Sequence, residues 1–104
     1  MASITEFQKM MKEVYYIRDC KRGAKGTYSW LKDEVEELWE TMQTNNKKAI
    51  EDEFADAIAW LTSLANILNI DLEKVAFRKY NNCCPKCNSS PCRCPQRAKM
   101  LPTH

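Results

Sequence analysis

The sequence predicts an all-α fold: an antiparallel bundle of about four helices, followed by a short cysteine-rich tail. Apolar residues recur at intervals of three and four along most of the first eighty residues, which is the period of a helix with one buried face. No segment alternates apolar and polar residues, and no hairpin turn joins β-branched runs, so no strand is expected. Short connections between the helices favour antiparallel neighbours.

The first predicted helix runs from Thr5, whose hydroxyl can cap it, to about Arg22. The basic segment 21–26 contains both glycines of the chain, and we expect it to be a mobile loop that ends this helix. The second helix should begin at Thr27 or Ser29, either of which can cap it. Its predicted inward stripe consists of Leu31, Val35, Leu38, Trp39 and Met42.

The third predicted helix covers about residues 47–69, and a short fourth helix follows with Asp71 as its cap. The second half of the third helix is apolar nearly all round, so neighbouring helices or a partner subunit must cover it. A chain of 104 residues also buries a small share of its surface, which favours pairing with another copy. The predicted inward residues of the third helix are Ile50, Phe54, Ala57, Ile58, Leu61, Leu64, Ala65 and Leu68.

Charge is segregated along the chain, although the net charge is only +2. Residues 27–56 contain three basic and nine acidic side chains, whereas residues 83–104 contain four basic and no acidic ones. An acidic centre between basic ends suits a cation site with a polyanionic ligand, and it also suits a surface that is simply soluble. The start of the chain lacks the pattern of a signal peptide, and the most apolar stretch is too short to span a bilayer. We therefore expect a cytoplasmic protein without membrane contact.

Four acidic residues form two short motifs, Glu34-x-x-Glu37 and Glu53-x-x-Asp56. At about 100° of rotation per residue, both pairs fall on the same half-buried shoulder of their helices, and Trp60 shares that shoulder. Such carboxylates repel one another unless cations or protons neutralise them, and oxygen ligands select magnesium or manganese. The alternative is two soluble helices whose acidic edges happen to match. Other acidic residues of the second helix are predicted to face water: Asp33, Glu36 and Glu40.

The segments that contain these motifs, residues 31–38 and 52–58, resemble the two signature helices of the MazG-like, all-α nucleoside triphosphate pyrophosphohydrolases. Residues 64–72 resemble the stretch that follows them, and the likeness covers about residues 27–80. The resemblance implies a homodimer or homotetramer that uses magnesium to hydrolyse a (deoxy)nucleoside triphosphate to monophosphate and pyrophosphate. It also implies a role in house-cleaning of the nucleotide pool.

Carried over by position, the resemblance makes Glu34, Glu37, Glu53 and Asp56 the magnesium ligands. Glu37 or Glu34 would position or deprotonate the attacking water. The chain departs from many relatives at Glu36, where they have a small residue, but this side chain is predicted to face solvent. The chain also contains a single copy of the motif pair, so it looks like a single-domain member of the family.

Candidate substrate contacts lie in two places. Arg78, Lys79 and Asn82 lie near the end of the fourth helix. Relatives often have basic or amide groups there, which could contact a triphosphate. A solvated helix end is the alternative. Trp60 is a candidate contact for the base, with packing in the core as the alternative.

Five cysteines lie within residues 83–94. The pairs Cys84-x-x-Cys87 and Cys92-x-Cys94 offer four thiolates, which suit tetrahedral zinc, and a metal could fold a segment that has no core of its own. A disordered or redox-active tail is the alternative. We accordingly divide the chain into a helical pyrophosphohydrolase domain, residues 1–82, and a zinc-binding tail, residues 83–104.

The basic residues around these cysteines leave nucleic acid open as a partner. Lys86, Arg93, Arg97 and Lys99 are typical of small zinc modules that touch nucleic acid. They support a rival function, in which the chain is a non-catalytic helical oligomer whose zinc tail binds nucleic acid or protein. The tail has no exposed aromatic residues for base stacking, which weakens this alternative.

Overall fold

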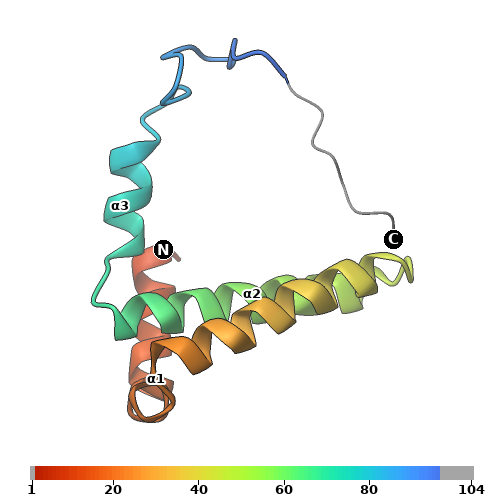
Figure 1. The fold of residues 1–104 in the computed structure, drawn as a ribbon, viewed down its shortest axis with the longest axis vertical. Helices are drawn as coiled ribbons and strands as arrows, with labels where there is room; N and C mark the ends of the chain where they lie inside the picture. The colour runs from red at the N-terminus through yellow and green to blue at the C-terminus, as the bar shows by residue number, and fades with distance from the viewer. Residues whose placement is uncertain (1, 97–104) are drawn as a thin grey trace. The chain divides into compact units, whose positions relative to one another are not determined.

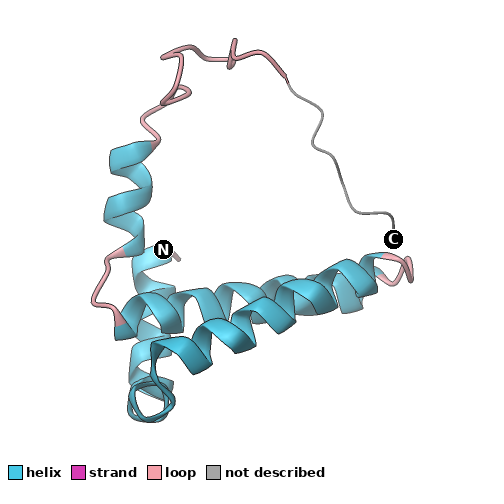
Figure 2. Cartoon of the chain, viewed as in Figure 1, coloured by secondary structure: helices cyan, strands magenta, loops and turns pink. Residues whose placement is uncertain are grey.

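The computed structural model describes residues 2–96, which form three helices and no strand (Figures 1 and 2). The helices are α1 (Ile4–Met42), α2 (Lys47–Ile67) and α3 (Leu72–Lys79). The all-α prediction is therefore confirmed, with three helices instead of about four because the first two predicted helices are joined in α1. The chain forms two compact units, Met1–Glu73 and Lys74–His104. Arg97 and Lys99, two basic residues of the predicted tail, lie outside the described residues.

The predicted loop at residues 21–26 is wrong, because α1 continues through it with a kink at one residue. Only Gly23 leaves helical geometry, with φ of 83° and ψ of 169°, a region open to glycine alone. Thr27 and Ser29 lie inside α1 and cap nothing, and the cap of α1 is Ser3 in place of Thr5. The Ser3 hydroxyl oxygen accepts a hydrogen bond from the backbone N–H of Glu6 at 3.1 Å. A single glycine thus changes the helix direction without a loop.

The second half of α1 and α2 lie side by side as an antiparallel hairpin (Figure 1). The connection is short, and Asn45 in it adopts a left-handed conformation with φ of 57°. Asn46 is the cap of α2, and its side chain accepts a hydrogen bond from the backbone N–H of Ala49 at 3.1 Å. This arrangement brings the two acidic motifs onto neighbouring helices, as the sequence predicts.

Buried amide side chains join the start of α1 to the end of α2. The Gln8 amide donates to Asn66 Oδ1 at 3.0 Å and to the Ile70 carbonyl at 2.7 Å, and Asn66 donates back to the Gln8 carbonyl at 3.1 Å. Gln8 Oε1 also accepts from the backbone N–H of Leu72. A buried amide left without partners costs about 1–3 kcal/mol, so this reciprocal pairing fixes the angle between the two helices.

The predicted inward stripes are largely wrong for a single chain. Met11 and Ala65 are the only buried apolar residues among residues 2–96, whereas Phe54 is 58% exposed and Val35 is 51% exposed. Two helices and a short third one cannot enclose a wide apolar face, so the stripe stays open. No helix within residues 2–96 is both long enough and apolar enough to cross a membrane. The other exposed members of the two stripes are Trp39, Met42, Ile58, Leu61 and Leu68.

Candidate functional site

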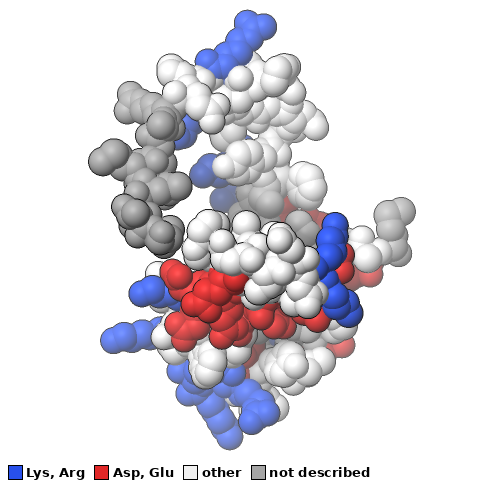
Figure 3. Space-filling view, turned by 90° about the vertical axis from the view of Figure 1, so that its right-hand side faces the viewer, with Lys and Arg blue, Asp and Glu red and all other residues white. Residues whose placement is uncertain are grey.

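Three carboxylates come together where α1 and α2 run side by side. Glu34 and Glu37 lie on α1, Glu53 lies on α2, and one oxygen from each lies within 4.8 Å of the others. We call these three residues the acidic cluster. Glu34 and Glu53 are half-buried, whereas Glu37 is exposed. Figure 3 shows acidic side chains gathered into one patch with basic side chains near its edges.

The acidic cluster is electrostatically unsatisfied. The pKa of Glu34 is raised to about 7, first by its removal from water and then by the negative charge of Glu37. Glu34 Oε2 and Glu53 Oε2 are buried and have no hydrogen-bond partner. Converging hard oxygen atoms without partners fit a divalent cation such as Mg²⁺, which would neutralise the repulsion and supply the missing contacts.

Asp56, the fourth acid of the two motifs, stands next to the acidic cluster but is not part of it. It lies three residues after Glu53 on α2, and its negative charge contributes to the raised pKa of Glu34. Its side chain is exposed and lines an adjacent cavity. The prediction that all four acids are half-buried is thus wrong for Glu37 and Asp56, because the stripe beside them is itself open to solvent. Asp33, Glu36 and Glu40 are exposed, as predicted.

The cavity beside Asp56 has a volume of about 350 Å³ and is formed by α1 and α2. Trp60 is part of its wall and stacks on Trp30, with the ring centres 5.6 Å apart and the planes 12° apart. The guanidinium of Arg22 lies 4.7 Å from the centre of the Trp60 ring. These two contacts hold the Trp60 ring in place. The cavity is lined by Met11, Tyr15, Arg18, Asp19, Arg22, Asp56, Ala59, Trp60 and Ser63.

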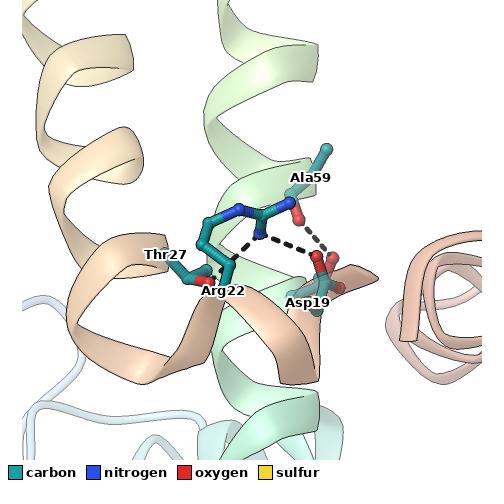
Figure 4. A network of polar contacts seen from close by, with 5 residues as sticks. Asp19, Arg22, Thr27 and Ala59 are labelled. Carbon is teal, nitrogen blue, oxygen red and sulfur yellow. Dashed lines mark hydrogen bonds and ion pairs between the residues drawn. The ribbon is translucent and has the colours of Figure 1, made fainter. Parts of the chain in front are cut away.

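A polar network at the α1 kink forms another part of this wall (Figure 4). Arg22 donates to Asp19 Oδ1 at 2.9 Å and to the Thr27 hydroxyl at 3.2 Å. Asp19 is 2% exposed, and its second oxygen, Oδ2, is buried without a partner. Gly26 makes room for this arrangement, because a Cβ atom there would lie 2.9 Å from Arg22 Cγ. Asp19 and Arg22 thus place one negative and one positive charge in the wall of the cavity.

Sequence reasoning missed Asp19, Arg18 and Arg22 as members of this site. A signal was present, because Asp19 and Arg22 have opposite charges three residues apart, directly before a glycine. The predicted loop at residues 21–26 began beside this pair, so Arg22 was expected at a helix end and not in a fixed contact. Cys20, their neighbour, is exposed and lies outside the cavity wall.

The predicted triphosphate contacts belong to the second unit of the chain. Arg78 and Lys79 form the last turn of α3, and the Lys79 ammonium lies 5.8 Å from the centre of the Tyr80 ring. Asn82 follows in a left-handed conformation with φ of 62°. All three residues are exposed, and their role toward a phosphate stays a prediction.

The second unit also contains a compact set of thiols, which we call the cysteine cluster: Cys84, Cys87, Cys92 and Cys94. One sulfur from each lies within 4.8 Å of the others, so the cluster could hold a metal ion. The backbone N–H of Arg93 lowers the pKa of Cys87 to about 6, and hydrogen bonds from backbone N–H groups also lower the pKa of Cys84. A hydrogen bond with Cys92 is the largest cause that raises the pKa of Cys94, to about 12.

A comparison with protein families decides which family this fold belongs to. The profile of the MazG nucleotide pyrophosphohydrolase domain matches residues 22–88, more than half of the chain. This chain belongs to the MazG family. The MazG match contains both acidic motifs and Trp60, and it ends between the two cysteine pairs. Membership indicates a nucleotide substrate and a divalent metal. The comparison with curated proteins gives no match.

Proposed function

We propose that this chain is a magnesium-dependent nucleoside triphosphate pyrophosphohydrolase that releases pyrophosphate and a nucleoside monophosphate. The acidic cluster carries this proposal, since Glu34 and Glu53 each hold one buried oxygen without a partner beside a third carboxylate. MazG family membership supports the reaction type. A house-cleaning role on the nucleotide pool follows from the same resemblance.

Each acid of the two motifs has a role in this proposal. Glu34, Glu37 and Glu53 hold Mg²⁺ (or Mn²⁺), and Asp56, at the cavity wall, completes the ligand set or holds a further ion. The bound ion supplies positive charge that offsets the charge of the phosphate oxygens as it builds in the transition state. Water attacks the α- or the β-phosphorus, the bond from that phosphorus to the α–β bridging oxygen breaks, and the two products are the nucleoside monophosphate and pyrophosphate. Glu37 or Glu34 positions this water and accepts its proton.

The cavity next to Asp56 is the proposed place for the nucleoside. Its volume of about 350 Å³ lies within the range of small-molecule sites, and Trp60 offers it an aromatic edge. Asp19 is held by Arg22 at the same wall, so a nucleoside there would meet a fixed pair of opposite charges. Arg18 supplies positive charge at the same wall. Arg78, Lys79 and Asn82 remain proposed contacts of the triphosphate.

We propose further that the enzyme is a homodimer or homotetramer in which a second copy covers the open apolar stripe. Phe54, Ile58 and Leu61 are each at least 44% exposed on one helix, and a stripe of this kind on a soluble protein marks an interaction surface. The second copy is the occupant that the family resemblance implies. Replacing Ile58 by aspartate should reduce the molecular mass measured by light scattering to that of one chain.

The direct test of the proposed activity is a panel of canonical and modified (deoxy)nucleoside triphosphates, incubated with the purified full chain and magnesium, with pyrophosphate as the readout. Wild type should turn over at least one member of the panel. Glu53→Gln should lose at least about 100-fold in kcat, because it removes one charged ligand from the site. Glu36→Gln is the matched control, since Glu36 lies between two site residues but is exposed.

Two outcomes contradict the proposal: no pyrophosphate from any nucleotide in the panel, or equal turnover by wild type and Glu53→Gln. Either would favour the rival function, a non-catalytic oligomer whose tail binds nucleic acid or protein. Among the described residues, that rival keeps Lys86 and Arg93 as its basic contacts.

A further inference from the structure

The cysteine cluster has a geometry that the nucleotide site does not explain. The sulfur atoms of Cys84 and Cys94 lie 3.8 Å apart, and those of Cys87 and Cys92 lie 3.9 Å apart. In a tetrahedral site with zinc–sulfur bonds of about 2.3 Å, neighbouring sulfurs are separated by about 3.8 Å. The two measured separations are therefore those of two opposite edges of a zinc–thiolate tetrahedron.

Backbone hydrogen bonds arrange the chain around these sulfurs. The backbone N–H of Asn88 donates to the Cys84 carbonyl at 2.7 Å, and the backbone N–H of Cys84 donates to the Ser89 carbonyl at 2.9 Å, which closes a tight turn. Within this turn, Cys84 and Cys87 point to a common centre. The backbone N–H groups of Arg93 and Cys94 donate to the sulfurs of Cys87 and Cys92, at 3.3 and 3.4 Å. Such donors favour sulfur in its negatively charged form, which is the form that binds metal.

Apart from these hydrogen bonds, the segment has no core that would hold the turn together. Residues 83–96 contain no large apolar side chain and no helix or strand. Hydrogen bonds at an exposed surface stabilise a fold only weakly, because water competes for the same groups. This segment has no core, yet its four thiols lie close together. Such a combination is typical of a small module that folds around a metal ion.

We propose that Cys84, Cys87, Cys92 and Cys94 bind one zinc ion in a closed structural site that folds residues 83–96. Four protein thiolates fill all the positions of tetrahedral zinc, so the site has no open position for a substrate and is not a second catalytic centre. Zinc with four thiolates has a charge of −2. Lys86 and Arg93 are the only charged side chains in residues 83–96, and their two positive charges offset it.

The proposal also assigns Cys83 and Cys20 a place outside the site. Cys83 directly precedes a ligand, yet it is absent from the group whose sulfurs converge, and Cys20 lies on α1. The zinc site is separate from the acidic cluster in ligand chemistry as well, since thiolates prefer soft ions and carboxylates prefer hard ones. The MazG match ends at residue 88 and so leaves out Cys92 and Cys94.

Zinc content of the full chain tests this proposal without reference to activity. After incubation with zinc and removal of the excess, elemental analysis should give one zinc per chain for wild type and for Cys83→Ser. The double variant Cys87→Ser, Cys92→Ser should lose at least about nine-tenths of it, because two of four ligands are gone. Its circular dichroism should stay helical, since all three helices end before residue 83.

Cobalt provides a second readout of the geometry. Wild type loaded with Co²⁺ should show the intense visible absorption of a tetrahedral cobalt–thiolate centre, and the double variant should not. The proposal is wrong if wild type holds no stoichiometric zinc, if the double variant keeps its zinc, or if the intact mass shows these cysteines paired in disulfides. Pyrophosphate release by the same samples tests the proposed function separately, so the failure of one is distinguishable from the failure of the other.

Discussion

The acidic cluster and the cysteine cluster each bring several candidate ligand atoms close together, but their geometry has opposite origins. Glu34, Glu37 and Glu53 lie on two long helices that already pack together, so the helices fix these carboxylates even while they repel one another. Cys84 to Cys94 lie in a segment without helix, strand or apolar core. In the acidic cluster, helix packing positions the side chains. In the cysteine cluster, the proposed zinc ion orders the chain.

Withdrawing magnesium should produce the largest effect and should leave the fold intact. Transferred into a magnesium-free buffer, the protein should lose activity by about 1,000-fold or more, because the charge that the ion supplies is worth several kcal/mol in the transition state. Circular dichroism should be unchanged, since the helices do not depend on the ion. Restoring Mg²⁺ or Mn²⁺ should restore pyrophosphate release. Unfolding on magnesium removal would contradict this expectation, since it would show that the two helices need the ion to stay packed.

Removing two of the proposed zinc ligands should instead disorder the segment that contains them. In the Cys87→Ser, Cys92→Ser double variant, trypsin should cut after Lys86 and Arg93 about 10-fold faster or more, because the segment loses the contacts that order it. The helical core should resist as in wild type, and mass spectrometry of the early fragments measures both rates. Cys83→Ser is the control. Equal cleavage of both variants would show that the turn is ordered without metal.

Loosening the scaffold should affect only the acidic cluster. Replacing Asn66 by alanine removes two buried hydrogen bonds to Gln8, one to its amide group and one to its carbonyl, so the free energy of unfolding measured in urea should fall by about 1–3 kcal/mol. We expect weaker magnesium binding by calorimetry and an unchanged zinc content. Asn81→Ala, at an exposed position, should change neither the free energy of unfolding nor magnesium binding. A loss of zinc in Asn66→Ala would contradict the independence of the two regions.

The smallest expected effect is a pH dependence of the magnesium-free protein. The pKa of Glu34 is about 7 in the folded chain against an ordinary value of 4.5, so folding favours its protonated form. Its stabilising contribution is complete below pH 4.5 and is lost as the pH rises toward and through about 7. The melting temperature should therefore fall by a few degrees from about pH 5 to about pH 8.

Two changes should flatten the dependence of the melting temperature on pH. Magnesium should do so because it replaces the proton on Glu34, and Glu34→Gln because its side chain does not titrate. Glu36→Gln is exposed and should keep the wild-type slope. A melting temperature of the magnesium-free protein that rises over the same pH range would show that Glu34 is not held in its neutral form.

Local spacing explains why much of this molecule was predictable. Helical rotation alone brings Glu34 near Glu37 and separates them from Glu36, and a family resemblance on the same residues led to the MazG family. Contacts between distant residues were not predictable in this way. Asp19 lines the cavity together with Asp56 and Trp60 of α2, and spacing along α1 does not show which residues of another helix it meets.

Burial was the weakest part of the prediction for a related reason. A helical wheel identifies which face is apolar, but it does not say whether this chain or another copy covers that face. Phe54 and Ile58 lie on the predicted stripe and are nevertheless exposed in the single chain. The wheel also cannot show that Gln8 and Asn66, both polar, form part of the interior.

The kink at Gly23 has a stereochemical consequence. Its backbone angles are forbidden to L-amino acids, but their mirror image falls in the broad extended region that L-residues prefer, so a D-amino acid fits this position without strain. An added Cβ built on Gly23 meets no atom within 4 Å. A chain with D-alanine at this position, assembled by chemical ligation at Cys20 and Cys83, would keep the bend while restricting the unfolded chain. The direction of α1 thus depends on the absence of an L-configured side chain at one position.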